Sequence, residues 1–160
     1  MSDHTTRLER VVSDAVREPS GTGARGLGVD VVSISRFGRL WHDRGESLRR
    51  LVFTPGELEY ARSRADTERR LAGTFAAKEA VFKALGLSWA RGAFSWTMIE
   101  ILRDERGLPH VALRDLAWSG FVRTGAGDVL VSISYEEDVA IAVAQAVAGA
   151  AFPSKGDATS

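Results

Sequence analysis

One long helix limits what this chain can fold into. The residues from about Thr67 to Leu85 have helical periodicity, and Gly86 follows them as a typical helix stop. One stripe of this helix is made of Leu71, Phe75, Lys78, Phe82 and Leu85. Four of these five side chains are apolar, so we expect the stripe to face a core. A charged residue on or beside this stripe therefore needs an explanation.

Lysine is used sparingly, and two of the three lysines lie on this helix, whereas the chain has eighteen arginines. Lys78 and Lys83 lie on either side of Glu79. The ammonium of lysine is compact, and its pKa shifts readily, whereas the guanidinium of arginine stays charged. The segment therefore looks selected for chemistry. The simpler interpretations are an exposed Glu79–Lys83 pair, worth about 0.2–0.5 kcal/mol, and a Lys78 stem lying on the core with its ammonium in water.

Composition excludes several classes of function. The 160 residues have an ordinary apolar content of 44% and a net charge of zero, which predict one globular domain and no nucleic-acid partner. Without cysteine, disulfides and thiolate metal sites are impossible. The three histidines are scattered, so an oxygen-bound ion such as Mg²⁺ is the metal we favour. The longest apolar stretch, Val139 to Phe152, is too short to span a membrane, and we expect a cytoplasmic protein without a signal peptide.

The chain divides into three regions. Residues 1–24 are polar and end in a Pro/Ser/Gly-rich stretch, which predicts an N-terminal extension and linker. Residues 25–150 form the expected domain. Residues 151–160 have the composition of a disordered tail.

Within the domain, a strand is followed by helices and then by hairpins. The expected elements are a strand at Gly26–Ile34, helices at Arg36–Arg49, Thr54–Arg64 and Leu116–Thr124, and hairpins at Ser95–Leu113 and Val129–Val147. Thr54, Pro55 and Glu57 have the spacing of a capping box with proline in the first turn. This order of elements favours an α+β fold with mainly antiparallel pairing.

Asp30 is the second candidate for chemistry. It is the only charge between Arg25 and Arg36, inside a strand that otherwise has the composition of a buried one. An isolated buried carboxylate is costly unless it is paired or bound to a metal. Two interpretations stay open from the strand alone, a metal ligand or a carboxylate that binds a backbone amide or an arginine.

Several segments together resemble the holo-[acyl-carrier-protein] synthase family, the small trimeric 4'-phosphopantetheinyl transferases. The strongest match is Leu71–Gly86, with the sequence LAGTFAAKEAVFKALG. Gly26–Phe37 is similar to the opening strand of the family, and Phe53–Glu57 is similar to its Phe-Thr-x-x-Glu helix start. Val131–Ser134, an acidic turn and Val139–Ala142 match the closing hairpin.

The resemblance implies the family's activity, which is transfer of 4'-phosphopantetheine from coenzyme A to a serine of an acyl carrier protein, with release of 3',5'-ADP. It also implies the family's fold, a mainly antiparallel sheet packed on a long helix. Asp30 and Glu79 would hold Mg²⁺, and Lys83 would contact the phosphates and assist removal of the serine proton. Family members of this size form trimers with active sites between subunits.

Other residues take their expected roles from the same resemblance. Gly86, Ser134, Tyr135 and Lys78 would lie at the coenzyme A site. Arg36, assisted by Arg39, would face the acidic carrier protein. An ordinary solvated helix face explains these arginines equally well.

The chain departs from the family at functional positions. Tyr135 stands where the family usually has histidine, and Thr74 stands where it often has arginine. Tyr135 supplies no positive charge at neutral pH, so either other arginines such as Arg69, Arg70 or Arg91 contact the phosphates, or coenzyme A is held differently. The first hypothesis is an active enzyme that modifies a fatty-acid carrier or a specialised polyketide or peptide synthase carrier. The alternatives are a catalytically impaired relative that binds coenzyme A or a carrier, and a repurposed enzyme on the same scaffold.

Overall fold

The computed structural model describes residues 23–88 and 94–148. The predicted extension, the tail and Arg91 lie outside the described residues, apart from the last two positions of the extension. The elements are β1 (Ala24–Ser33), α2 (Ile34–Val52), α3 (Pro55–Arg62), α4 (Thr67–Ala84), the 3₁₀ helix η2 (Trp96–Met98), β2 (Ile99–Arg103), β3 (Pro109–Leu113), α5 (Asp115–Thr124), β4 (Asp128–Glu136) and β5 (Val139–Val147).

All strand pairs are antiparallel. One sheet has the order β1-β5-β4, and β2 and β3 form a two-stranded ribbon. The α+β class and both hairpins expected from the sequence are thereby confirmed. The first strand of the earlier hairpin is shorter than predicted, because Trp96–Met98 form a 3₁₀ turn before Ile99.

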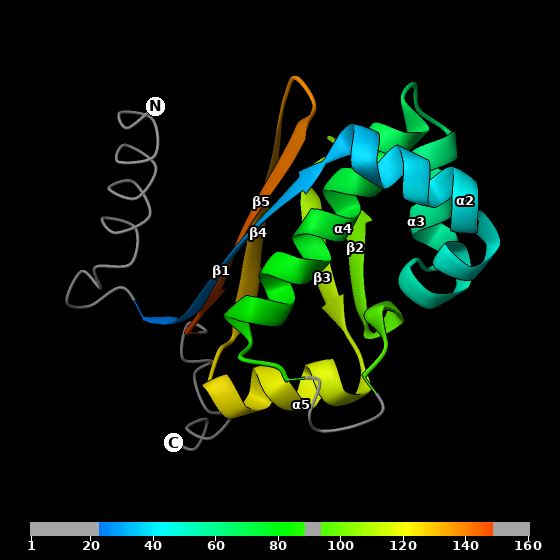
Figure 1. Ribbon diagram of the computed structural model, residues 1–160. Helices are drawn as coiled ribbons and strands as arrows, with labels where there is room; N and C mark the ends of the chain where they lie inside the picture. Colours follow the sequence, from blue (N-terminus) through cyan, green and yellow to red (C-terminus); the bar gives the residue numbers. More distant parts are fainter. Residues whose placement is uncertain (1–22, 89–93, 149–160) are drawn as a thin grey trace, which may run out of the picture.

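Helix α4 lies at the centre of the molecule, between the three-stranded sheet and the β2–β3 ribbon (Figure 1). It is buried on nearly every side, and five of its eleven buried residues are alanine. The facing strand β5 buries four further alanines completely. These small side chains let the helix pack close to the sheet. From Leu71 to Ala84, only Phe75, Glu79 and Lys83 keep appreciable exposure.

Strand β1 makes the closest approach to α4. A Cβ atom built on Gly28 would overlap the carbonyl oxygen of Ala80, and one built on Gly26 would overlap that of Ala84. Only glycine fits where two backbones approach this closely. The two glycines thus press one edge strand directly onto the central helix.

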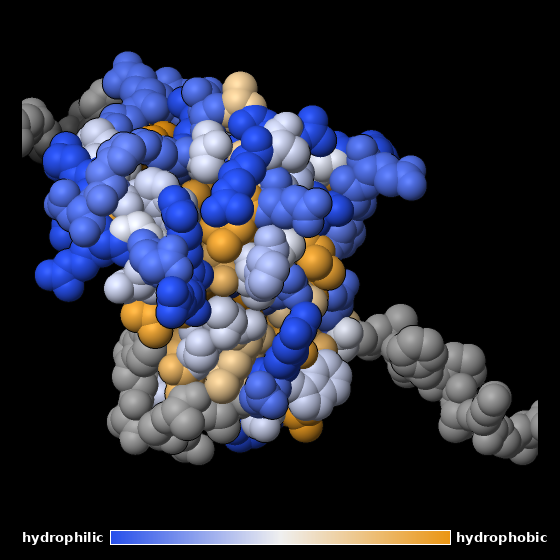
Figure 2. All heavy atoms as spheres, turned by 90° about the vertical axis from the view of Figure 1, so that its right-hand side faces the viewer, coloured by the Kyte–Doolittle hydropathy of each residue, from blue (hydrophilic) through white to orange (hydrophobic). Residues whose placement is uncertain are grey.

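Helix α2 covers the upper end of α4 and bends at Arg44, whose φ of −128° is not helical. Its inner side contributes Phe37 and Trp41, which pack with Phe53 in an aromatic cluster. The helical spacing of the sequence predicts Phe37, Leu40, Trp41 and Leu48 on one side of this helix, but Leu40 is 46% exposed, so the prediction is wrong for that residue. Figure 2 shows mainly hydrophilic residues over the α2–α3 side, with apolar residues exposed in a band below them.

Helix α3 begins with the predicted capping box. The Thr54 hydroxyl accepts a bond from the Glu57 amide, and the Glu57 carboxylate accepts one from the Thr54 amide. No helix within the two described ranges is long and apolar enough to cross a membrane.

Replacing Gly28 by alanine should destabilise the fold strongly. The new methyl group would meet the backbone of α4, which cannot move aside as a flexible side chain can, so we expect a loss of about 3 kcal/mol or more. The measurement is chemical denaturation of Gly28→Ala. Gly45→Ala is the control, because its Cβ would meet only the tip of Arg49, at 4.0 Å. Similar stability of both variants would contradict the close approach.

Candidate active site

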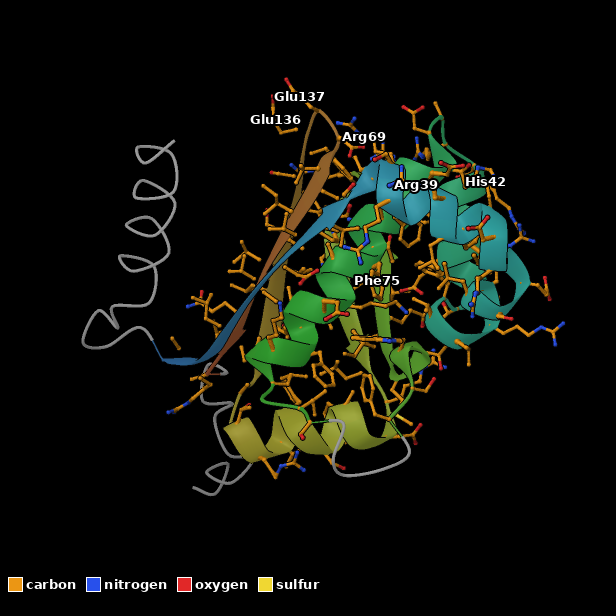
Figure 3. The ribbon with its side chains drawn as sticks, viewed as in Figure 1. Arg39, His42, Arg69, Phe75, Glu136 and Glu137 are labelled. Carbon is orange, nitrogen blue, oxygen red and sulfur yellow. The ribbon has the colours of Figure 1, made fainter. Side chains whose placement is uncertain are left out.

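The accessible side of α4 contains two of the candidate catalytic residues. Phe75, Glu79 and Lys83 follow one another at intervals of four residues, so they lie on one side of the helix. The helical wheel placed Phe75 on the buried stripe, but in the structure it is only partly buried and packs against Phe37 of α2, with ring centroids 6.2 Å apart. Figure 3 shows Phe75 on the side of α4 below α2.

Asp30 reaches this side of the helix because β1 lies against α4. The Lys83 ammonium is 2.8 Å from an Asp30 carboxylate oxygen and also donates to the Val29 carbonyl, at 2.9 Å. The Lys83 side chain is 47% exposed and that of Asp30 is 17% exposed. Lys83 thus stays available to a ligand while it neutralises a carboxylate on the neighbouring strand.

The two predicted metal ligands share a cavity of about 520 Å³. Asp30 and Glu79 line it together with residues of β1 and α2, among them Arg36 and Asp43. Partial burial raises the pKa of Glu79, the charge of Asp30 raises it further, and Lys83 opposes the shift. A carboxylate whose proton affinity is raised by burial and by a neighbouring carboxylate marks a site where a cation is favoured.

The chemistry of this donor set fits a hard divalent ion. Mg²⁺ is usually bound by one or two carboxylates, with waters and substrate phosphates completing the octahedron. The described residues contain no group of three or more acidic or histidine side chains that converge on one point. Asp30 and Glu79 would therefore depend on phosphate oxygens for the remaining ligands.

Lys78 does not belong to this cavity, which corrects the expectation of a role at the coenzyme A site. Its side chain has no exposed surface, and the ammonium is 2.7 Å from the Glu57 carboxylate. It also donates to the carbonyl oxygens of Val52 and Trp96. Three partners use the three donors of an ammonium. Lys78 thus neither contacts a ligand nor extends to water.

Glu57, the partner of Lys78, links three elements. Its carboxylate also accepts bonds from the amides of Thr54 and Ile101. Burial raises the pKa of Glu57 and lowers that of Lys78, and each partner opposes the shift of the other. The sequence indicated Glu57 only as a capping residue, because nothing in its spacing reveals a partner on a distant helix.

Gly86 ends α4 with a positive φ of 58°. The amides of Gly86 and Leu87 bond to the carbonyls of Lys83 and Phe82, which is the Schellman pattern. Nothing lies within 4 Å of the position of a Cβ atom there. The turn conformation accounts for this glycine, and its contact with coenzyme A stays a prediction.

Ser134 and Tyr135 do not reach the cavity of Asp30 and Glu79 within one chain. They are neighbours on β4, so their side chains point to opposite faces of the sheet. Ser134 is exposed, whereas Tyr135 faces α4 where Gly73 leaves room for its ring. Because β1 and β4 are the two edges of the sheet, Tyr135 and Asp30 lie at opposite edges.

A second cavity, of about 270 Å³, surrounds Tyr135. Arg70 of α4 and Arg103 of β2 line it, and none of its lining residues is acidic. The Nε atoms of both arginines and the Tyr135 hydroxyl are buried without a hydrogen-bond partner among the described residues. Burial raises the pKa of Tyr135, although Arg103 and Arg70 oppose that shift. We call this cluster the cation pocket.

The sequence analysis named three arginines that could contact the phosphates, and one of them, Arg70, lines the cation pocket. Arg69 instead stacks on the Tyr135 ring, with its guanidinium carbon 4.9 Å from the ring centroid. Sequence reasoning missed Arg103, although a charge at the end of a buried strand was a usable signal. Burial lowers the pKa of Arg103.

The arginines expected to face a partner both lie near the start of α2. Arg36 lines the cavity of Asp30 and Glu79. Arg39 lies on the exposed side of the helix, as Figure 3 shows. The structure therefore puts one of them at the site and the other beside it.

Comparisons with known proteins show which family this chain is similar to. A profile of the 4'-phosphopantetheinyl transferase superfamily matches residues 26–144. The holo-[acyl-carrier-protein] synthase of Geotalea daltonii is 41% identical over 118 residues, 74% of this chain and 94% of that protein. The Neisseria meningitidis holo-[acyl-carrier-protein] synthase structure aligns with a TM-score of 0.68 and 34% identity, covering 77% of this chain and 98% of that one. The Helicobacter pylori enzyme in complex with coenzyme A aligns with a TM-score of 0.63 and 26% identity, covering 74% and 96%.

Replacement by methionine should destabilise the fold far more at Lys78 than at Lys83. Lys78→Met leaves the Glu57 carboxylate buried without its cation, so the free energy of unfolding should fall by about 3–5 kcal/mol. Lys83→Met removes a half-exposed pair and should cost less than about 1 kcal/mol. Denaturant titration measures both. Adding Glu57→Gln to Lys78→Met should recover part of the loss, and equal stability of the two single variants would contradict these roles.

Proposed function

Because this chain belongs to the holo-[acyl-carrier-protein] synthase family of the 4'-phosphopantetheinyl transferase superfamily, we propose that it transfers 4'-phosphopantetheine from coenzyme A to a serine of an acyl carrier protein. The observation that carries the proposal is the cavity in which Asp30, Glu79 and Arg36 meet. Lys83 lies beside it, paired to Asp30. Two carboxylates with an adjacent ammonium are the groups needed to hold a pyrophosphate with its cation.

In the proposed reaction, the serine oxygen attacks the β-phosphorus of coenzyme A. The bond between that phosphorus and the bridging oxygen of the pyrophosphate breaks, and 3',5'-ADP leaves. The serine proton passes to solvent water as the new oxygen–phosphorus bond forms. Lys83 is placed to donate hydrogen bonds to phosphate oxygens, because its partners Asp30 and Val29 leave room on a half-exposed ammonium. A donor aimed at developing charge lowers the barrier.

We assign Asp30 and Glu79 as the ligands of Mg²⁺. When bound, such an ion polarises the phosphoryl oxygens and stabilises charge on the leaving group. The raised pKa of Glu79 supports the assignment, since it reflects partial burial first and the charge of Asp30 second. The metal requirement itself stays a prediction.

We further propose that the cation pocket binds the 3'-phosphate of coenzyme A. A phosphate monoester carries close to two negative charges, which two guanidiniums in a pocket with no acidic lining residue can match. The pyrophosphate is already assigned to the opposite edge of the sheet, so the monoester is the group left for this pocket. Arg70 and Arg103 would then supply the charge that Thr74 and Tyr135 lack.

This arrangement needs more than one subunit, and we propose a homotrimer. The outer face of the three-stranded sheet exposes Val31, Leu130 and Val143, at 59%, 53% and 40%. An apolar sheet face of this kind is suited to packing against copies of itself. Association along it would bring the β4 edge of one subunit toward the β1 edge of the next. The cytoplasmic location expected from the sequence stays a prediction.

The partner is proposed to bind at α2. Arg36 at the cavity and Arg39 on the exposed side suit an acidic carrier, because complementary charge steers association. Whether the carrier serves fatty acid, polyketide or peptide synthesis is decided by assay. Purified protein is incubated with coenzyme A, Mg²⁺ and a panel of apo carrier proteins. A mass gain of one phosphopantetheine on a carrier identifies the substrate.

The second candidate function is a non-catalytic relative that binds coenzyme A or a carrier. The observation that favours it is Tyr135 with Thr74 in place of the family's cations. Tight binding of coenzyme A or a carrier, with no mass gain on any member of the panel, would support this candidate and overturn the enzyme.

Replacing Glu79 by glutamine should abolish transfer while the fold becomes slightly more stable without metal. The folded-state pKa of Glu79 is raised above the model-peptide value of 4.5. Its charge therefore destabilises the fold above that pKa, and the penalty fades as the pH falls toward 4.5. The gain from Glu79→Gln should follow the same pH dependence.

Thermal unfolding with and without Mg²⁺ measures this effect separately from activity. Mg²⁺ should raise the melting temperature of the wild-type protein and not that of Glu79→Gln. Normal transfer by Glu79→Gln, or an equal Mg²⁺ effect on both proteins, would count against metal ligation.

Replacing Arg103 or Arg70 by glutamine should weaken the binding of coenzyme A but not that of 3'-dephospho-coenzyme A. Loss of a charge-assisted bond to phosphate should raise the KM for coenzyme A by about tenfold or more. The KM for 3'-dephospho-coenzyme A should stay unchanged, since the contacted group is absent. Arg106→Gln, an exposed arginine of the neighbouring turn, is the matched control. Equal effects on both substrates would place the 3'-phosphate elsewhere.

A further inference from the structure

The first turn of α2 is held by a residue from another part of the chain. Asp138 lies in the turn between β4 and β5, and its carboxylate accepts bonds from the hydroxyls of Ser33 and Ser35, both at 2.8 Å. It also accepts one from the Ser35 amide, at 2.7 Å. Its backbone carbonyl accepts the Ile34 amide, at 2.8 Å. Figure 3 shows the tip of this hairpin, with Glu136 and Glu137, close to the start of α2.

These bonds satisfy donors that a helix leaves open at its start. The first amides of an α-helix have no partner within the helix and are usually bonded by a single capping side chain. Here the hydroxyl of the capping residue Ser33 accepts a hydrogen bond from the Arg36 amide, at 3.2 Å, and donates one to the Asp138 carboxylate. The bonds from Ser35 and Ser33 hold the pKa of Asp138 below its ordinary value. The Asp138 carboxylate, which we call the anchor, is thus an anion at the positive, N-terminal end of α2.

The anchored turn is the part of α2 that reaches the proposed active site. Arg36 and Phe37 line the cavity of Asp30 and Glu79, and Ser33 lines it as well. Asp138 itself is not among the lining residues. It fixes the backbone from which Arg36 extends, without contacting the cavity.

We infer that Asp138 is a positioning residue for carrier recognition, acting through Ser33 and Ser35 on the first turn of α2. The inference rests on the proposed function, because it takes an acidic carrier protein as the partner of Arg36. It separates the two substrates. Affinity for the carrier depends on the β4–β5 turn more than affinity for coenzyme A does, because the pyrophosphate is assigned to Asp30, Glu79 and Lys83, on β1 and α4.

The sign of the effect distinguishes anchoring from simple charge. Arg39 is near enough to lower the pKa of Asp138. Removing the negative charge of Asp138 would therefore leave Arg39 freer to attract an acidic partner, which alone would tighten binding. Loss of the anchor predicts the opposite result, weaker binding of the carrier, because the backbone that carries Arg36 is no longer held in one position.

The experiment compares steady-state transfer by the full-length wild-type protein, Asp138→Asn, Ser35→Ala and the double variant. Asp138→Asn should raise the KM for the apo carrier by about fivefold, the size of a lost helix cap. The KM for coenzyme A should stay within about twofold of the wild-type value, inside the usual scatter for independent sites. The double variant should resemble Asp138→Asn, because both changes break one network. Glu136→Gln, which loses an equal charge in the same hairpin, should leave the carrier KM unchanged.

Three results would overturn the inference. They are an unchanged or lower carrier KM for Asp138→Asn, an equal rise in both KM values, and an equal effect of Glu136→Gln. A wild-type protein that modifies no carrier would overturn the proposed function and the docking role together. Hydrogen exchange of the Ser35 and Arg36 amides then still tests the anchor, since it should be faster in Asp138→Asn whether or not the protein is active.

Discussion

The contact of β1 with α4 is the constraint on which the proposed site depends. Gly26 and Gly28 let the strand lie against the helix backbone, and the buried alanines of α4 and β5 let the rest of the sheet pack close to the helix. At this separation a carboxylate on the strand and an ammonium on the helix are within hydrogen-bond distance, as Asp30 and Lys83 are. Larger residues at the glycine positions would move the strand outward, and the two carboxylates would no longer share one cavity.

Burial gives the two lysines of α4 different tasks. Lys78 is enclosed with Glu57 and bonds to two backbone carbonyls, so its charge fixes how α4 meets α3 and the chain around Val52. Lys83, five residues later, faces the opening beside Asp30. The intervening Glu79 lies on the Lys83 side. A rotation of α4 by one residue would exchange these environments. The buried ion pair therefore also sets the orientation of the helix side that carries Glu79 and Lys83.

Much of the fold followed from local patterns. The capping box at Thr54, the end of α4 at Gly86 and both hairpins depend on neighbouring residues and were predicted from the sequence. The environment of Lys78 was not, because a helical wheel identifies an apolar side without showing what packs on the other sides. Leu40 and Phe75 were misplaced for the same reason. The cation pocket joins Arg70, Arg103 and Tyr135 from three elements, and only the packing of those elements brings them together.

The two cavities at opposite edges of the sheet have a consequence for how such a protein would behave in a cell. A single copy presents a carboxylate cavity at one edge and an arginine pocket at the other. If neighbouring copies unite these halves, catalytic output would not scale linearly with the amount of polypeptide made. At low expression most chains would be isolated and inactive, and output would rise steeply once the chains began to assemble.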